Sequence, residues 1–258
     1  EMAAAFVTVA QSATTAPLNP AYKEEEFAFY LEDLKARAII LEAGYQGPAR
    51  SAAQRFDMSV IELHPAAKAG QFTLTTETIG AAEDCEPQAD DIALILHTSG
   101  TTSRPKIVPL LQSNIAASAQ NIQKSLALTP DDCCLNVMPL FHIHGLIAAV
   151  TASLAAGASI SCASGFDALK FYGWLEEVNP SWYTAVPTMH QAILARAPRN
   201  LDIIQNARLR FLRSSSSSLP GPVMTELAET FGAPVVEAYG MTEAAHQMCC
   251  NPIEPGRQ

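Results

Sequence analysis

The chain has 258 residues, of which 26 are acidic and 16 are Lys or Arg, so its formal net charge is −10 at neutral pH. This balance argues against nucleic-acid binding, because phosphate backbones are bound by clusters of Lys and Arg, and the sequence contains none. Hydrophobic residues make up 48% of the chain, enough to fill a sizeable core, which argues against extended disorder.

The cysteines and the apolar stretches indicate the cellular compartment in which the protein is found. Cys133 and Cys134 are adjacent, as are Cys249 and Cys250, and no CxxC spacing occurs, so we expect free thiols in the cytoplasm. The Ala-rich residues 2–16 imitate a secretory signal but lack a preceding basic segment. The uncharged run 145–163 is long enough to span a membrane, but it is rich in small residues and we predict a buried helix followed by a buried strand. No membrane span is therefore expected.

Apolar runs alternate with amphipathic stretches along nearly the whole chain. This alternation predicts an α/β fold in which helices cover both faces of a doubly wound parallel sheet. The predicted strands cover residues 38–41, 59–63, 92–97, 135–138, 159–162, 182–186, 210–212 and 235–238. The predicted helices cover residues 24–35, 113–126, 168–178, 188–197 and 222–231.

The second of these helices illustrates the periodicity. Ile115, Ala119, Ile122 and Leu126 recur at helical spacing and form one apolar stripe, which we expect to pack on the sheet. Ser113 is the candidate N-cap.

Residues 92–108, IALILHTSGTTSRPKIV, run from a buried strand into a polar loop. Gly100 allows the backbone to approach a ligand closely, and Lys106 supplies a positive charge. Hydroxyl donors come from Thr98, Ser99, Thr101 and Thr102. We predict a phosphate-binding loop, although its spacing does not fit the GxxxxGK[ST] pattern of P-loop enzymes, and a hydroxyl-rich surface turn is the alternative.

The segment TSGTTSRPK resembles the signature loop of the adenylate-forming (AMP-binding) superfamily, which includes acyl-CoA synthetases, luciferases and peptide-synthetase adenylation domains. The resemblance implies that residues 1–258 are part of that superfamily's large N-terminal domain, incomplete at both ends, with the mobile C-terminal domain absent. Ser103 and Ile107 stand where the superfamily usually has Gly, so we expect a stiffer or reshaped loop.

Two histidines follow in the segment PLFHIHGL, residues 139–146, which resembles the superfamily's Pro-x-Phe-His stretch. The resemblance implies that His142 lies between the acid and the ATP phosphates. From the residues alone, His142 and His144 are also compatible with a zinc site or with hydrogen-bonded structural histidines, and both alternatives stay open.

The segment VVEAYGMTE, residues 235–243, resembles the superfamily's Tyr-Gly-x-Thr-Glu motif. The resemblance implies that Tyr239 packs on adenine, that Thr242 contacts phosphate and that Glu243 binds Mg²⁺. It also assigns Glu237 and Ala238 to the nucleotide site. The alternative is a strand end with an unrelated acidic residue.

A serine run, RSSSSSLP at residues 213–220, matches the superfamily's small-residue turn beside the adenine. The resemblance assigns Ser216, Ser217 and Ser218 to this turn, and a flexible linker is the alternative reading of the composition.

By the same resemblance, His144, Met241 and His246 line the pocket for the acid. Imidazoles lose hydrogen bonds against a hydrocarbon tail, so two of them favour a short polar acid such as oxalate. Arg213 is a further candidate whose direction the sequence does not give. The stretches QSATTAPLNPAYKEEEFAFYL and EAYGMTEAAHQM also resemble the plant and fungal oxalate:CoA ligase group.

The resemblance implies an ATP-dependent, AMP-forming acid:CoA ligase that uses ATP, Mg²⁺ and coenzyme A, while the chain by itself is expected to be inactive or very weak. The alternatives are a medium-chain or aromatic acyl-CoA synthetase and a noncatalytic nucleotide-binding module. A cytoplasmic location is expected, with the peroxisome left open.

Overall fold

The computed structural model describes residues 1–76, 86–98 and 105–253. Within these residues the largest sheet has six strands in the order β11-β10-β9-β8-β6-β7. Neighbouring strands are parallel except at one edge, where β11 runs antiparallel to β10. The strands are β6 (Cys133–Asn136), β7 (Ser159–Cys162), β8 (Trp182–Ala185), β9 (Phe211–Ser214), β10 (Val235–Met241) and β11 (His246–Cys250).

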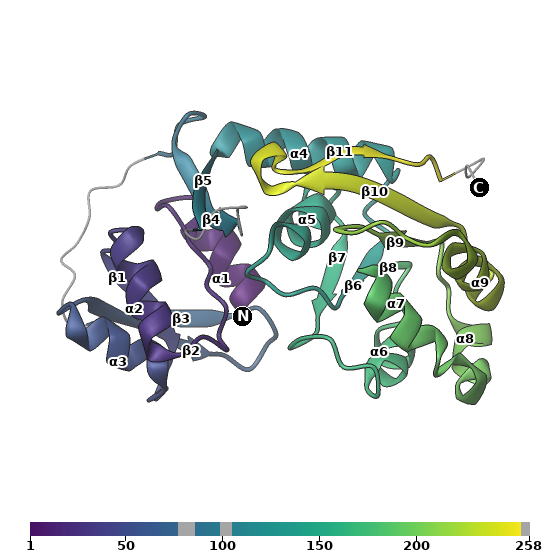
Figure 1. Cartoon of the computed structure of the whole chain (residues 1–258), viewed down its shortest axis with the longest axis horizontal. Coiled ribbons are helices and arrows are strands. Elements are labelled where there is room, and N and C mark those ends of the chain that lie inside the picture. The colour runs from purple at the N-terminus through teal and green to yellow at the C-terminus, as the bar shows by residue number, and fades with distance from the viewer. Residues whose placement is uncertain (77–85, 99–104, 254–258) are drawn as a thin grey trace.

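Helices cover both faces of this sheet (Figure 1). One face packs against α4 (Gln112–Ser125), the π-helix η1 (His144–Thr151) and α5 (Ala152–Ala155). The other packs against α6 (Phe171–Val178), α7 (Pro187–Leu194), η2 (Ala197–Arg199), α8 (Leu201–Asn206) and α9 (Gly221–Phe231). Successive strand residues alternate between the two cores, as Trp182 and Tyr183 do, because side chains of a strand point to opposite faces. The doubly wound fold is confirmed.

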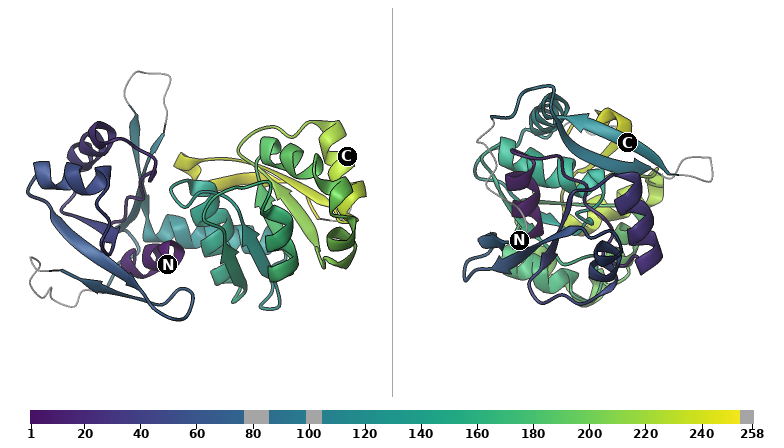
Figure 2. Two further views of the ribbon diagram at one scale, coloured as in Figure 1. Left: turned by 90° about the horizontal axis from the view of Figure 1, so that it is seen from below. Right: turned by 90° about the vertical axis from the view of Figure 1, so that its left-hand side faces the viewer.

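A smaller three-stranded sheet lies at the opposite end of the molecule (Figures 1 and 2). It consists of β1 (Ala38–Glu42), β2 (Ser59–Pro65) and β3 (Phe72–Thr75), with β1 parallel and β3 antiparallel to β2. The helices α2 (Glu24–Asp33) and α3 (Pro48–Arg55) pack against it around Phe27, Leu31 and Ala52.

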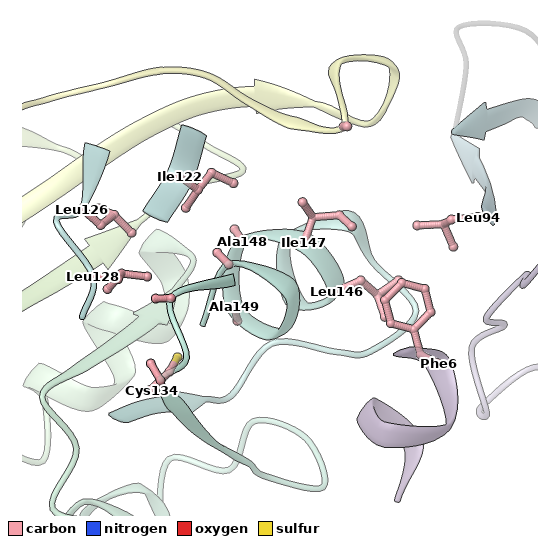
Figure 3. Packing of buried hydrophobic residues seen from close by; sticks show 14 of the residues in the cluster. Phe6, Leu94, Ile122, Leu126, Leu128, Cys134, Leu146, Ile147, Ala148 and Ala149 are labelled. Atoms are coloured by element: carbon pink, nitrogen blue, oxygen red, sulfur yellow. The ribbon is translucent and has the colours of Figure 1, made fainter. Parts of the chain in front are cut away.

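Helix α1 and a β-hairpin join the core of the large sheet. Helix α1 (Met2–Val9) places Phe6 beside Leu146 of η1 (Figure 3). The hairpin consists of β4 (Ile92–Thr98) and β5 (Lys106–Leu111), and Leu94 of β4 joins the same core. Thr98 and Lys106 are therefore opposite each other at its end.

The sequence located most elements correctly, with two local errors. The strand expected at 135–138 is β6, which ends at Asn136, because the Asn136 side chain bonds both the N–H and the C=O of Met138 and turns the chain. The expected N-cap Ser113 is wrong, since α4 begins at Gln112 and the Asn114 side chain accepts from the Leu111 N–H at 2.9 Å. Elements α1, α3, α8, β3, β5 and β11 were not anticipated.

The uncharged run 145–163 folds as expected into buried helix and then strand, as η1, α5 and β7. None of the helices in the described part of the chain is long and apolar enough to cross a membrane.

Candidate active site

Loops at the carboxyl ends of the parallel strands surround a cavity of about 420 Å³. Ligands of doubly wound sheets characteristically bind at this edge. The wall includes His142 and His144 after β6, Ser216 after β9, Met241 and Thr242 at the end of β10, and His246 at the start of β11. His142 and His246, which lie 104 positions apart in the sequence, thus line one cavity.

Gly145 fixes the path of the chain beside this cavity. A β-carbon at Gly145 would overlap the carbonyl oxygen of Pro139, so only Gly allows the loop after β6 to pass this close to η1. The π-helix then begins at His144, whose side chain is buried, whereas His142 lies exposed at the cavity. Desolvation lowers the pKa of His142.

Both ring nitrogens of His144 have partners. Nδ1 lies 3.0 Å from Ser216 Oγ, and Nε2 lies 2.6 Å from Thr184 Oγ1. Arg213 Nη1 also approaches Nε2, at 3.1 Å. Burial, followed by the charge of Arg213, holds the pKa of His144 well below its ordinary value, so the ring is neutral at physiological pH.

Arg213 is fully buried on β9, directly behind His144. Nη2 donates to Gln247 Oε1 at 3.0 Å, while Nε has no hydrogen-bond partner among the described residues. The described residues also offer it no ion pair with a carboxylate. Burial lowers the pKa of Arg213 to about 10, which leaves it charged at neutral pH. A buried charge without a counter-ion is costly, because the lost hydration is not replaced.

His246 is the second buried imidazole. Its ring centroid lies 5.0 Å from that of His144, and its Nδ1 is buried without a partner in the part of the chain that the structure describes. Burial and then the charge of Arg213 hold the pKa of His246 well below its ordinary value. Its φ of +95° is a strained conformation that costs about 1–3 kcal/mol, and such strain concentrates at functional sites.

The residues expected around adenine lie on β10 and the turn after β9. Tyr239 is 63% exposed and presents its ring to solvent. Buried Ala238 accepts a hydrogen bond from Ser215 Oγ at 2.8 Å, and Glu237 Oε1 accepts from the Leu219 N–H at 2.7 Å. Glu237 therefore secures the serine turn.

The serine run itself bends between β9 and α9. Ser216, Ser217 and Ser218 are exposed, and Ser216 has a φ of +73°. The turn is thus held at both sides, by β9 and by Glu237, instead of forming a free linker.

The residues expected near the phosphates only partly fall within the described structure. Lys106 is the first residue of β5, and β5 contacts the 3₁₀ turn η3 (Thr242–Ala244), so exposed Lys106 and exposed Glu243 belong to touching elements. Ser99, Gly100, Thr101, Thr102 and Ser103 lie outside the described residues. Ile107 occupies regular strand geometry in β5, which a β-branched residue favours.

The zinc alternative finds no support in the arrangement of the histidines. Across residues 1–76, 86–98 and 105–253 no group of three or more His, Cys, Asp or Glu side chains could hold a metal. Both nitrogens of His144 are engaged, and the guanidinium beside Nε2 repels a cation.

Thr184 and Gln247 were not anticipated as members of this cluster. Thr184 contacts His144 from the neighbouring strand β8, and Gln247 contacts Arg213 from β11. A hydroxyl near the carboxyl end of a predicted parallel strand was the one available signal for Thr184.

A doubly wound sheet with this polar cavity at its carboxyl edge defines an α/β ligand-binding domain of the kind found in nucleotide-dependent enzymes. The chain belongs to the AMP-binding enzyme family, whose model matches residues 1–258.

Its relatives include an oxalate–CoA ligase of Arabidopsis thaliana, 43% identical over 247 residues, which are 93% of this chain and 48% of that protein. An oxalate–CoA ligase of Saccharomyces cerevisiae is 37% identical over 270 residues, which cover 94% of this chain and 49% of that one. The crystal structure of ATP-bound MatB from Rhodopseudomonas palustris superimposes with a TM-score of 0.80 at 27% identity, over 98% of this chain and 50% of that one. The chain spans about half the length of the relatives it matches.

Proposed function

We propose that the full-length gene product is an ATP-dependent, AMP-forming acid:CoA ligase that activates oxalate or a very similar short dicarboxylate. One observation carries the choice of acid: beside apolar residues such as Met138, Val186 and Met189, the wall of the cavity includes the two buried neutral imidazoles of His144 and His246 and the Ser216 hydroxyl, with the fixed positive charge of Arg213 behind them. The names of the Arabidopsis and yeast relatives support the same choice.

In the first step a carboxylate oxygen attacks the α-phosphorus of ATP, forming the acyl–phosphate bond and releasing pyrophosphate. The thiolate of coenzyme A then attacks the acyl carbon, forming the thioester and releasing AMP with the electron pair of the broken C–O bond. The protein's task is to align the reactants and stabilise charge, so no side chain has to act as a nucleophile.

We assign the remaining residues the roles that the resemblance to the superfamily motifs implies, and their positions are compatible with these roles. Tyr239 stacks on adenine with its exposed ring, and the backbone of the turn at Ser216–Ser218 borders the base beside Glu237 and Ala238, which leaves the Ser216 hydroxyl free to face the acid. Lys106 and Thr242 contact the phosphates, together with the hydroxyls of the loop that begins at Thr98. His142, an exposed residue of the cavity wall, takes the position between the acid and the nucleotide that the resemblance implies. Met241 is part of the acid-binding wall.

Glu243 is an exposed carboxylate on a turn that contacts the strand of Lys106, which suits a hard cation next to phosphate oxygens. It would hold Mg²⁺, and the ion would supply positive charge to the phosphates.

Medium-chain and aromatic acids are disfavoured by the same wall, because a hydrocarbon tail would leave the imidazole of His246 and the charge of Arg213 without polar partners. We assign residues 1–258 to the large N-terminal domain. We assign the protein to the cytoplasm, in line with the free thiols at Cys133, Cys134, Cys162, Cys249 and Cys250.

The reaction is tested by incubating the full-length gene product with oxalate, ATP and coenzyme A and analysing the products by mass spectrometry. We expect AMP and oxalyl-CoA in equal amounts. Formation of ADP, or binding of ATP without turnover of any acid, would contradict the proposal; the second result would favour a noncatalytic nucleotide-binding module.

A further inference from the structure

Among the described residues, Arg213 stands out because its burial cannot be explained by a contribution to stability. It is fully buried and charged, yet its partners in the described residues are neutral, namely His144, Thr184 and Gln247. Nearby Arg210 shows the ordinary arrangement, since its Nη2 pairs with Asp132 Oδ2 at 3.0 Å. Replacing a buried charge by an apolar side chain of similar volume is often neutral or stabilising. Stability therefore does not explain why this position carries a charge, which points to a role of Arg213 in binding.

The contacts of Arg213 determine where His144 carries its proton. A guanidinium only donates hydrogen bonds, so His144 Nε2, 3.1 Å from Nη1, is an acceptor. The Thr184 hydroxyl, 2.6 Å from the same nitrogen, donates as well. The neutral ring then carries its hydrogen on Nδ1 and donates it to Ser216 Oγ at 3.0 Å.

Ser216 in turn has its own hydroxyl hydrogen left to donate, and it lines the cavity. Its φ of +73° is an uncommon conformation for a residue with a β-carbon, which indicates that the turn holds the hydroxyl in this place at some cost. The order of donation runs from Arg213 to His144, from His144 to Ser216, and from Ser216 into the cavity.

We propose that Arg213 is a positioning and specificity-determining residue: through His144 it aims the Ser216 hydroxyl at the distal carboxylate of the acid, and its unpaired charge is balanced by that carboxylate. The inference rests on the proposed function and names the residue that makes the site select acids with a second carboxylate. Arg213 acts from behind His144, so it is not a catalytic residue.

The distal carboxylate does not change during adenylation, so its contacts contribute equally to substrate and transition state. In the full-length gene product, Arg213→Met should raise the KM for oxalate about 10- to 100-fold, the range expected when the Ser216 hydroxyl is no longer held in place to donate to a charged group. The kcat and the KM for ATP should stay near the wild-type values. The melting temperature without substrate should be unchanged or higher, because a desolvated charge is removed.

Arg210→Met is the matched control, because it removes the same side chain from the same part of the chain but leaves Asp132 unpaired. It should lower the melting temperature and leave the KM for oxalate unchanged. If Arg213→Met instead lowers the melting temperature and raises the KM for oxalate and for ATP alike, Arg213 is structural and the proposal is contradicted.

A second readout is independent of the acid. In the full-length gene product labelled with ¹⁵N-histidine, the His144 ring should show a protonated Nδ1, and Arg213→Met should shift the ring toward a mixture of tautomers. A ring that keeps its proton on Nδ1 in the variant contradicts the proposal. If the wild-type enzyme does not use oxalate, the proposed substrate is wrong, and this measurement still decides whether Arg213 orients His144.

Discussion

Gly240 lies so close to the backbone of His246 that a β-carbon at Gly240 would overlap the His246 carbonyl oxygen. The contact closes the turn between β10 and β11 and coincides with an irregular register between Tyr239 and Gly240. It also fixes the strained backbone of His246, whose ring forms part of the cavity wall. The Gly of the Tyr-Gly-x-Thr-Glu segment is therefore required by packing.

Gly240→Ala should force β10 and β11 apart. We expect the free energy of unfolding to fall by about 1–3 kcal/mol, as for overpacked interiors, and the KM for the acid to rise because His246 moves. Urea denaturation and steady-state kinetics measure the two effects. The control is Gly173→Ala in α6, where a β-carbon meets nothing within 4 Å; there the helix should gain about 0.5–1 kcal/mol. Equal behaviour of the two variants would refute the packing argument.

Asp33 and His97 connect α2 to the strand that leads into the predicted phosphate loop. His97 Nε2 lies 3.1 Å from Asp33 Oδ2, and both side chains are largely buried. Asp33→Asn should lower the free energy of unfolding by about 1–3 kcal/mol and raise the KM for ATP, because β4 loses its anchor. Thermal unfolding and ATP titration provide the measurement.

The exposed pair between Arg55 and Glu25 serves as the comparison for Asp33, since solvent screens an exposed ion pair and Glu25→Gln should leave the free energy of unfolding nearly unchanged. An Asp33→Asn variant with wild-type stability and wild-type KM for ATP would show that the pair does not hold β4.

The lowered pKa of Asp132 implies that the stability of the protein depends on pH. Burial raises the pKa of Asp132, but hydrogen bonds from the Ser181 hydroxyl, the Thr129 N–H and Arg210 outweigh it, and the net pKa is below its ordinary 3.8. The unfolded chain therefore binds the proton more readily. The stabilisation is fully present above the ordinary pKa and is lost as the pH falls through the lower, folded value.

Asp132→Asn should remove this part of the acid dependence. Denaturant unfolding of both proteins between pH 7 and pH 3, in steps of about half a unit, should give a smaller loss of stability for the variant at the acid end. Parallel curves for the two proteins would mean that Asp132 titrates alike in the folded and unfolded chain.

The sequence predicted the strands of the large sheet well, because a parallel sheet buried on both faces produces short, nearly continuous apolar runs such as Trp182–Ala185. It did not predict β5 or β11. In β5, the apolar residues Ile107 and Pro109 occupy exposed positions, as Met248 and Cys249 do in β11. Polar and apolar residue types therefore do not alternate clearly along either strand.

Short motifs predicted the residues of the candidate site, but they did not predict the hydrogen-bond network around His144. His144 meets Thr184 and Arg213 only because β8 lies between β6 and β9 in the sheet, an order that local sequence does not encode. The direction of the Arg213 side chain depends on this packing. The positive φ of His246 likewise follows from the close approach of Gly240, which becomes apparent only in three dimensions.

The proposed function depends on the formation of an adenylate from a short dicarboxylate. It is tested most directly by ATP–pyrophosphate exchange in the full-length gene product with oxalate, malonate, octanoate and coumarate, with Lys106→Ala and His246→Ala measured in parallel. We expect oxalate to support the fastest exchange, Lys106→Ala to weaken this exchange because a positive charge beside the phosphates is lost, and His246→Ala to raise the KM for oxalate. Faster exchange with octanoate or coumarate than with oxalate would contradict the proposed function.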